Sequence, residues 1–343
     1  MIVLALVVGC SAPAAQESIG AAIELPTHTP APTLTPAPTL TPVPTLTPVP
    51  TLTPRISTCA SVTLPPNSQQ VPLALPTPIV PAPLPMQPGR SRLLDTKFRS
   101  ALLGKEMPIL LYLPPGYDDS QRRYPVLYML SGFAGDYREW IMWGMCDTIE
   151  FLIRNGQIQP MIVVMPEGER SWWFNHAPVP GSDGKPWGDY IWKDVVNYVD
   201  ANYRTLPQRE SRAIGGLSSG GQSALMFGLT HPEVFSIVGA HSPSLRGADG
   251  SLAIFGDADY FKQYDPLWLF RNTTTWRELT LWVDIGADDN QWGTVILQMH
   301  EILDALNIPH EWHDTWHGIH DGYYWSAHVA DYLTWYASKL KGQ

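Results

Sequence analysis

The chain has 343 residues, enough for one large domain with appendages or for two average domains. Its formal net charge of -10 argues against nucleic acid or an anionic membrane as the main partner, because phosphate binding requires clustered Lys and Arg. The 3 cysteines have neither metal-ligand nor redox spacing and exclude a disulfide scaffold, so we expect Cys146 to be a small core residue.

Residues 1–25 have the character of a leader. Residues 1–9 are apolar but too few to span a membrane as a helix. At the end of this run, Val7-Val8-Gly9-Cys10 resembles the lipobox of bacterial lipoproteins, in which the cysteine is lipidated. The basic segment that precedes the apolar run in such signals is missing. We expect a truncated lipoprotein signal with Cys10 as a membrane anchor, and hence an extracytoplasmic, cell-surface protein. A trimmed secretory signal, giving a secreted protein, and a chance match are the alternatives.

Residues 26–90 form a proline-rich linker. Between Thr29 and Pro54 the pattern Thr-Pro-Ala/Val-Pro-Thr-Leu repeats with a six-residue period. Proline cannot donate a ladder hydrogen bond and holds φ near the polyproline II value, so this stretch is predicted to be disordered, without helix or sheet. A stiff spacer behind an anchor would hold a domain away from a cell surface; a tail without such a role is the alternative.

Residues 91–343 are expected to fold as a single α/β domain. Apolar or alternating runs predict strands at residues 95–103, 107–113, 124–130, 161–165, 211–214, 235–240, 279–285 and 311–315. Helical periodicity predicts helices at residues 140–154, 190–203, 292–306 and 328–340 and one beginning near 222, with an irregular stretch up to 277. Strands that alternate with helices predict a mostly parallel sheet covered by helices on both faces. Ligands of such sheets bind at the carboxyl ends of the strands.

A Gly-x-Ser-x-Gly motif lies between a predicted strand and a predicted helix. Residues 214–221 read IGGLSSGG, which places Ser218 at the junction. This arrangement is typical of a nucleophile elbow, in which glycines are needed where a Cβ would collide with the strand or the helix. The alternative is a Gly/Ser-rich turn in some other α/β protein.

A serine nucleophile needs a histidine base, and the histidine needs a carboxylate. Further along the chain, Asp288 and Asp289 follow one predicted strand, and His317 and His320 follow the last one. The order serine, acid, histidine is that of α/β-hydrolases. A metal site built from His313, His317 and His320 is a weaker interpretation, and we expect no metal.

From about residue 98 to residue 341 the chain resembles the putative esterase branch of the α/β-hydrolase superfamily, which includes S-formylglutathione hydrolase (esterase D), feruloyl and acetyl-xylan esterases and mycolyltransferases. The segments that carry the resemblance are LYMLSGF (127–133), GLSSGG (216–221), GADD (286–289), and His320-Asp321 followed by Tyr324-Trp325. The resemblance implies an α/β-hydrolase fold and hydrolysis of carboxylic esters without a cofactor.

The resemblance also assigns roles. Ser218 matches the nucleophile and His320 the base, in preference to His317. Asp289 matches the acid, in preference to Asp288. The oxyanion hole would consist of the backbone N–H groups of Phe133 and Ser219.

Substrate-binding candidates are Trp172 and Trp173, whose rings could stack on a sugar or a feruloyl group, and His241, which follows a predicted strand. For the tryptophans the alternative is packing of a large loop; for His241 it is a bond to a backbone carbonyl.

We therefore expect a secreted or surface-anchored serine carboxylesterase that acts on small or carbohydrate-linked esters, such as feruloyl or acetyl esters. One alternative is an acyltransferase that passes the acyl group to a sugar hydroxyl. Another is a surface binding module without catalytic activity.

Overall fold

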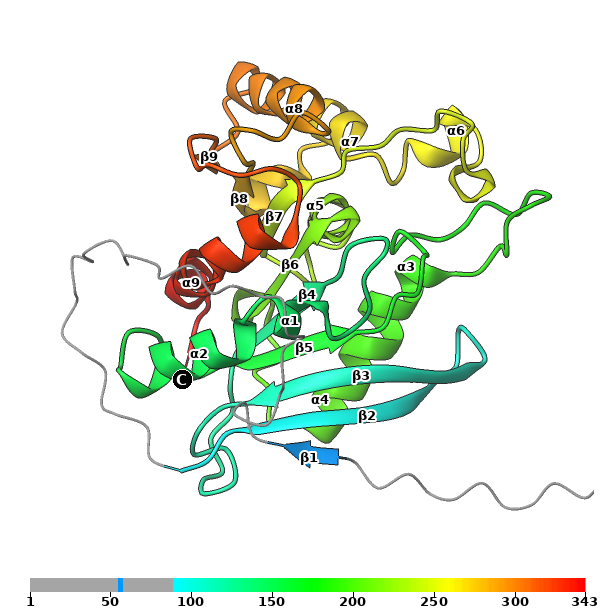
Figure 1. Cartoon of the computed structure of the whole chain (residues 1–343). Coiled ribbons are helices and arrows are strands. Elements are labelled where there is room, and N and C mark those ends of the chain that lie inside the picture. Colours follow the sequence, from blue (N-terminus) through cyan, green and yellow to red (C-terminus); the bar gives the residue numbers. More distant parts are fainter. Residues whose placement is uncertain (1–54, 58–88, 343) are drawn as a thin grey trace, which may run out of the picture. The chain divides into compact units, whose positions relative to one another are not determined.

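The computed structural model describes residues 55–57 and 89–342. Within this part of the chain, nine strands form one sheet in the order β1-β2-β3-β5-β4-β6-β7-β8-β9 (Figure 1). The strands are β1 (Arg55–Ser57), β2 (Arg92–Ser100), β3 (Lys105–Leu113), β4 (Val126–Leu130), β5 (Ile162–Pro166), β6 (Arg212–Ser218), β7 (Ile237–Pro243), β8 (Thr280–Asp284) and β9 (Glu311–His313).

The sheet is mostly parallel, as the sequence predicts. The six strands from β5 to β9 along the sheet run parallel, whereas β1, β2 and β3 join antiparallel at one edge. Every residue of β4, β5 and β7 is buried, as expected of strands covered on both faces. The carboxyl ends of β6, β7 and β8 therefore meet at one edge of the sheet.

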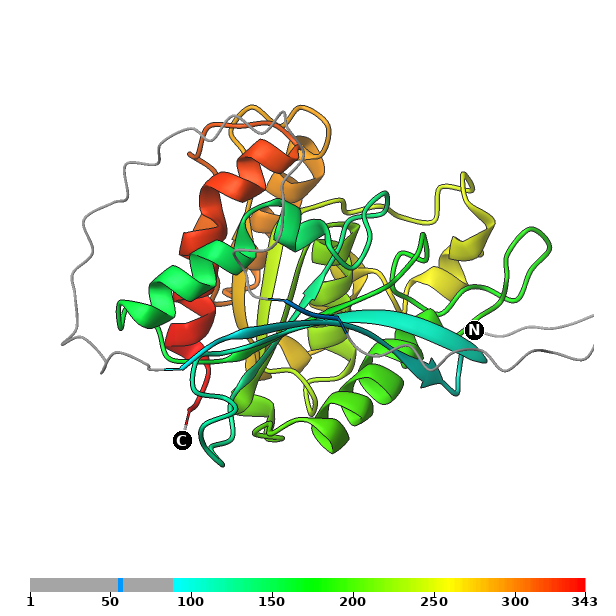
Figure 2. The ribbon, with the colours of Figure 1, turned by 60° about the horizontal axis from the view of Figure 1, so that its bottom comes forward.

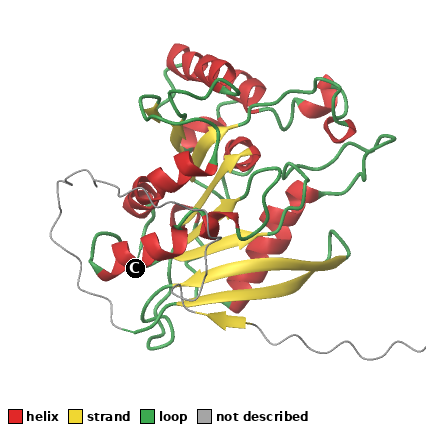
Figure 3. Ribbon diagram, in the orientation of Figure 1, coloured by secondary structure: helices red, strands yellow, loops and turns green. Residues whose placement is uncertain are grey.

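Helices cover both faces of the sheet (Figures 2 and 3). One face packs against α2 (Met145–Arg154) and α9 (Gly322–Lys339), and the other against α4 (Val196–Asn202), α5 (Ser219–Thr230), α7 (Pro266–Asn272) and α8 (Gly293–Ala305). The remaining helices are α1 (Glu139–Met142), α3 (Trp187–Asp189), a π-helix (Tyr190–Val195), α6 (Ala258–Phe261) and 3-10 turns at Arg209–Ser211, Ala253–Phe255 and Thr275–Glu278.

Two glycines of neighbouring strands allow α9 to pack closely. A Cβ on Gly215 of β6 or on Gly239 of β7 would overlap the hydroxyl of Tyr336, whose side chain is fully buried. The small residues in the strands therefore make room for a large one in the helix, which fixes how α9 lies against the sheet.

Several predicted boundaries differ from the structure. The helix expected at residues 140–154 is interrupted at Gly144, whose φ of 87° requires a left-handed conformation that glycine adopts without strain. The stretch from residue 241 to about residue 277 was expected to be irregular, but it contains the end of β7 and the helices α6 and α7, which are capped by Asp257 and Asp265. The closing helix, predicted to begin at residue 328, begins at Gly322 because the Asp321 carboxylate accepts hydrogen bonds from the N–H groups of Tyr323 and Tyr324.

The predicted leader with Cys10 and nearly all of the predicted linker lie outside the described residues. Residues 55–57 fall in that linker, yet they form β1 along the edge of β2. Arg-Ile-Ser contains no proline, so its N–H groups are free to pair with an edge strand.

Cys146 is buried in α2 as expected, but it is also disulfide-bonded, so its interpretation as only a small core residue was wrong. None of the helices described is long and apolar enough to cross a membrane.

Candidate active site

Ser218 lies at a strained turn between β6 and α5. Its φ of 55° and ψ of -120° are unusual for a residue with a side chain. The turn is possible because its neighbours are glycines: a Cβ on Gly216 would overlap the backbone of Gly220, and one on Gly220 would lie 2.6 Å from the carbonyl oxygen of Leu130. The geometry is that of a nucleophile elbow, with the serine side chain presented at the edge of the sheet.

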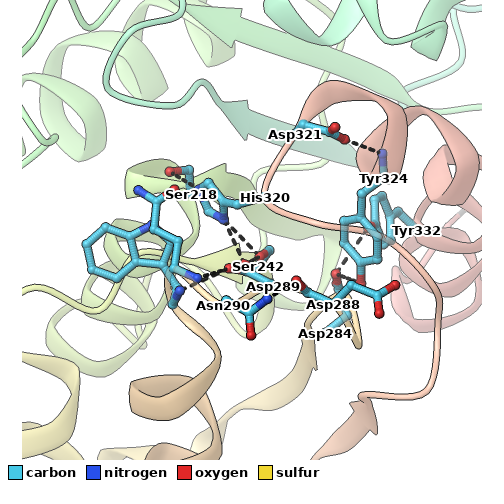
Figure 4. A network of polar contacts seen from close by, with 12 residues as sticks. Ser218, Ser242, Asp284, Asp288, Asp289, Asn290, His320, Asp321, Tyr324 and Tyr332 are labelled. Atoms are coloured by element: carbon cyan, nitrogen blue, oxygen red, sulfur yellow. Dashed lines mark hydrogen bonds and ion pairs between the residues drawn. The ribbon is translucent and has the colours of Figure 1, made fainter.

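The structure brings the three predicted triad side chains together (Figure 4). The Ser218 hydroxyl lies 2.8 Å from His320 Nε2, and His320 Nδ1 lies 3.0 Å from Asp289 Oδ2. With the ring protonated at Nδ1, the serine donates to Nε2 and the histidine donates to the carboxylate. Trp325 of α9 stands edge-on to the imidazole at 5.1 Å between ring centroids and limits its rotation.

Asp289 is held as an ionised carboxylate. Burial of this side chain opposes ionisation, but hydrogen bonds from His320, from the N–H of Trp292 and from Ser242 outweigh it and lower the pKa of Asp289. An ionised carboxylate beside Nδ1 fixes the tautomer of His320 and would stabilise its protonated form.

The competing residues point elsewhere. Asp288 is 57% exposed and accepts a hydrogen bond from the N–H of Gly318, so it connects two loops at the surface. His317 is 95% exposed. The preference for Asp289 and His320 over these neighbours therefore agrees with the positions of the side chains.

Backbone pairing beyond β8 and β9 holds the two loops together. The N–H of Ile285 donates to the carbonyl of His313, that of Ala287 to Trp316 and that of Asp288 to Gly318. These backbone hydrogen bonds continue the pairing of β8 with β9, and they align the loop that carries Asp289 with the loop that carries His320.

Ser242 is a site residue that the sequence did not reveal. Its hydroxyl lies 2.9 Å from Asp289 Oδ2 and 3.1 Å from His320 Nδ1, so it donates to the carboxylate beside the histidine proton. Ser242 has a φ of 45°, which turns its side chain toward the triad near the end of β7. No local pattern marks this serine, because its role depends on contacts with two distant segments.

The loop that carries Phe133 and the start of α5 at Ser219 both lie beside Ser218. A Cβ on Gly132 would lie 3.5 Å from that of Ser218, so the loop after β4 runs directly beside the serine. The N–H of Gly132 donates to Glu139, but no acceptor is present for the N–H of Phe133 among the residues described. Ser219 is the first residue of α5, whose first N–H groups have no acceptor within the helix.

Glu139 anchors this loop. Its Oε2 accepts the N–H of Gly132 at 2.7 Å. Burial raises the pKa of the Glu139 carboxyl above its usual value, although the hydrogen bond from Gly132 opposes this shift. The loop is held further by Trp173 Nε1, which donates to the carbonyl of Ser131 at 3.0 Å.

The proposed substrate-binding role of Trp172 and Trp173 does not fit their positions. They are only 5% and 2% exposed. Trp172 packs against the rings of Phe133 and Phe255, and Trp173 lies against Gly168 and bonds to Ser131. With their faces covered, these tryptophans shape the loop beside the serine and offer no open ring for stacking.

His241 was also predicted wrongly as a substrate contact. The strand β7 continues to Pro243, so His241 lies within it, fully buried beneath α9. Its Nδ1 lies 2.7 Å from Asp284 Oδ2 and its Nε2 lies 3.0 Å from the Tyr336 hydroxyl. His241 is therefore part of a buried polar network and does not reach the edge of the sheet.

Most of the chain matches a known protein family. Residues 100–341 match the family model described as "Putative esterase". An esterase of Mycobacterium tuberculosis (strain H37Rv) is 30% identical over 154 residues, covering 44% of this chain and 32% of that protein. An endo-1,4-beta-xylanase/feruloyl esterase of Xylanibacter ruminicola is 31% identical over 147 residues, covering 41% of this chain and 20% of that protein. The aligned part thus spans a third or less of the length of these relatives.

Solved structures share the fold. A ferulic acid esterase superposes with a TM-score of 0.65 at 21% identity, covering 73% of this chain and 98% of that one. An S-formylglutathione hydrolase of Staphylococcus aureus superposes with a TM-score of 0.59 at 19% identity, covering 73% and 100%. At these identities the similarity establishes the fold, which is that of an α/β-hydrolase.

Proposed function

Because the chain belongs to this esterase family, we propose that it is a carboxylic ester hydrolase that acts through an acyl-enzyme formed on Ser218. The observation that carries the proposal is the chain of contacts from Ser218 Oγ to His320 Nε2 and from His320 Nδ1 to Asp289. These contacts allow a serine at the end of β6 to lose its proton to a histidine that is already oriented.

The proposed reaction follows from these positions. His320 Nε2 accepts the hydroxyl proton of Ser218 while Oγ attacks the ester carbonyl carbon. The carbonyl oxygen becomes negatively charged and is stabilised by the N–H groups of Phe133 and Ser219. The alcohol then leaves with the proton from His320. In the second half, His320 takes a proton from water, hydroxide attacks the acyl-enzyme, and the carboxylic acid leaves as Ser218 regains its proton.

We propose feruloyl or acetyl esters of carbohydrates, or similar small esters, as substrates. Support comes from the relatives, one of which is named a xylanase/feruloyl esterase, and from the structural similarity to a ferulic acid esterase. We further propose an extracytoplasmic location, with lipidation of Cys10 as the anchor and secretion as the alternative; both rest on the sequence of the first 25 residues.

The test is hydrolysis of p-nitrophenyl acetate and methyl ferulate by the full chain and by its Ser218→Ala variant. We expect turnover of at least one ester, and its loss in the variant. Ser326→Ala, which changes an exposed serine of α9, is the matched control and should behave as the wild type. Equal turnover by the Ser218→Ala variant, or no turnover by the folded wild type, would contradict the proposal.

Acyl transfer is the second candidate, because a sugar hydroxyl could attack the same acyl-enzyme in place of water. Product analysis with and without a carbohydrate acceptor separates the two reactions. A binding module without catalytic activity is the third, and it requires that Ser218→Ala leave the function of the protein intact.

A further inference from the structure

The helix α8 leads toward the edge strand β9 (Figure 1). The end of α8 and the segment before β9 carry a cluster of two histidines and an aspartate. His300 and Asp304 are four residues apart near the end of α8, so their side chains lie on the same face of the helix. Asn307, with a φ of 52°, turns the chain after the helix and returns His310 to that face. His300 Nδ1 lies 2.9 Å from His310 Nε2, and His300 Nε2 lies 3.5 Å from Asp304 Oδ2.

The two imidazoles are oriented by neighbours outside the cluster. His310 Nδ1 donates to the carbonyl of Ile308 at 2.8 Å, which leaves the lone pair on Nε2 directed at His300. The ring of His300 stacks on Trp312 with 4.1 Å between centroids and 3° between planes. A backbone carbonyl that fixes the tautomer of a histidine is the arrangement that metal-ligating histidines ordinarily have.

The position also favours a cation. The carbonyl groups at the end of α8 give this end of the helix a partial negative charge, and Asp304 adds a carboxylate. Asp304 is 64% exposed and His300 is 25% exposed, so an ion could reach the cluster from solvent.

We propose that His300, Asp304 and His310 bind one Zn²⁺ ion. One ring nitrogen from each histidine and one carboxylate oxygen supply three ligands, with atoms that lie within 4.8 Å of one another. Two imidazoles and a carboxylate suit Zn²⁺, and exposure of the cluster leaves the fourth position for water.

Such an ion would connect α8 to the residue that enters β9. β9 leads directly into the loop that carries His320, and it is an edge strand, held on one side only by β8. We therefore assign the site a stabilising role for this edge of the sheet. It takes no part in the proposed ester hydrolysis, because none of its residues contacts Ser218, Asp289 or His320 among the described interactions.

The test is titration of the full chain with ZnCl₂ by calorimetry, after removal of metal with a chelator and dialysis. We expect one ion per chain at this site. His310→Gln and Asp304→Asn should each weaken binding by about tenfold or more while the far-ultraviolet circular dichroism stays unchanged. Co²⁺ bound in place of Zn²⁺ should give a visible absorption band that His310→Gln removes.

His231→Gln is the matched control. His231 also stacks on a tryptophan, Trp192, at 4.1 Å, and also lies near a carboxylate, 3.3 Å from Glu233. Among the described residues, no second imidazole contacts it. This variant should bind Zn²⁺ as the wild type does. Absence of Zn²⁺ binding by the wild type, or equal binding by the wild type, His310→Gln and Asp304→Asn, would overturn the proposal.

Discussion

The hydroxyl of Tyr324 donates to the carboxylate of Asp284 at 2.8 Å, so the first turn of α9 is tied to the end of β8 (Figure 4). The same carboxylate accepts from Tyr332, from Trp282 Nε1 and from His241. Burial and the neighbouring Asp284 carboxylate raise the pKa of Tyr324, which keeps its hydroxyl a donor. Because His320 lies just before α9, this buried network also helps to fix the position of His320, the proposed base.

Asp284→Asn is therefore expected to destabilise the protein. The amide would direct N–H groups at neighbours that are themselves donors, leaving buried polar groups unpaired. We expect the free energy of unfolding in urea to fall by about 3 kcal/mol. Asp331→Asn, which breaks a partly exposed contact with His328, should cost less than about 1 kcal/mol. Equal effects of the two variants would contradict this role of Asp284.

The proposed acid can be tested against its neighbour. Asp289→Asn removes the carboxylate that fixes the tautomer of His320, and kcat for p-nitrophenyl acetate should fall by about 10³-fold to 10⁴-fold. Asp288→Asn changes an exposed carboxylate and should leave kcat nearly unchanged. A larger loss in Asp288→Asn than in Asp289→Asn would reverse the assignment.

The lowered pKa of Asp289 predicts a dependence of stability on pH. A carboxyl group with a pKa below its ordinary value of 3.8 binds its proton less readily in the folded state than in the unfolded chain. Its contribution to stability is full above that ordinary value and is lost as the pH falls through the lower, folded value. The difference in unfolding free energy between the wild type and Asp289→Asn should therefore stay nearly constant from pH 7 to about 4 and shrink as the pH is lowered further. A difference that does not change below about pH 4 would contradict the ionised state assigned to Asp289.

Glu139 offers a pair of variants that separates charge from hydrogen bonding. Glu139→Gln keeps an oxygen that can accept the N–H of Gly132, so kcat should stay close to that of the wild type. Glu139→Ala leaves this N–H without its acceptor and loosens the loop that carries Phe133. We expect kcat to fall by about tenfold, which corresponds to the loss of one hydrogen bond of about 1.4 kcal/mol. Similar values of kcat for the two variants would show that Glu139 does not position the loop.

Most strands of the sheet and their mostly parallel arrangement could be predicted because the signals are local. The apolar runs at β4 and β5 predict buried strands, and the structure has them. The glycines around Ser218 predict a tight turn between strand and helix, which the structure also has. The start of α9 was missed although its signal is present: Asp321 caps the helix, but the apolar periodicity is clearer further along. The helices α6 and α7 were not predicted because they are short, so their sequences show no clear helical periodicity.

The site residues likewise fall into those that a local pattern predicts and those that it does not. Ser218, Asp289 and His320 could be chosen from motif and chain order, whereas Ser242 and Glu139 act through contacts between segments that are distant in sequence. The errors at Trp172, Trp173 and His241 have one cause. A residue next to the carboxyl end of a strand can point into the core as well as toward the substrate, and only the packing of α9 and of the loop after β5 decides between these directions.

The central claim is that Ser218 is the nucleophile, and the most direct measurement is its covalent capture. The full chain would be treated with a fluorophosphonate, which reacts with activated serines, and the site of modification mapped by mass spectrometry of peptides. We expect one adduct, on Ser218, that is absent from Ser218→Ala and retained in the exposed-serine variant Ser326→Ala. An adduct on another residue, or no adduct on the folded wild-type protein, would contradict the account.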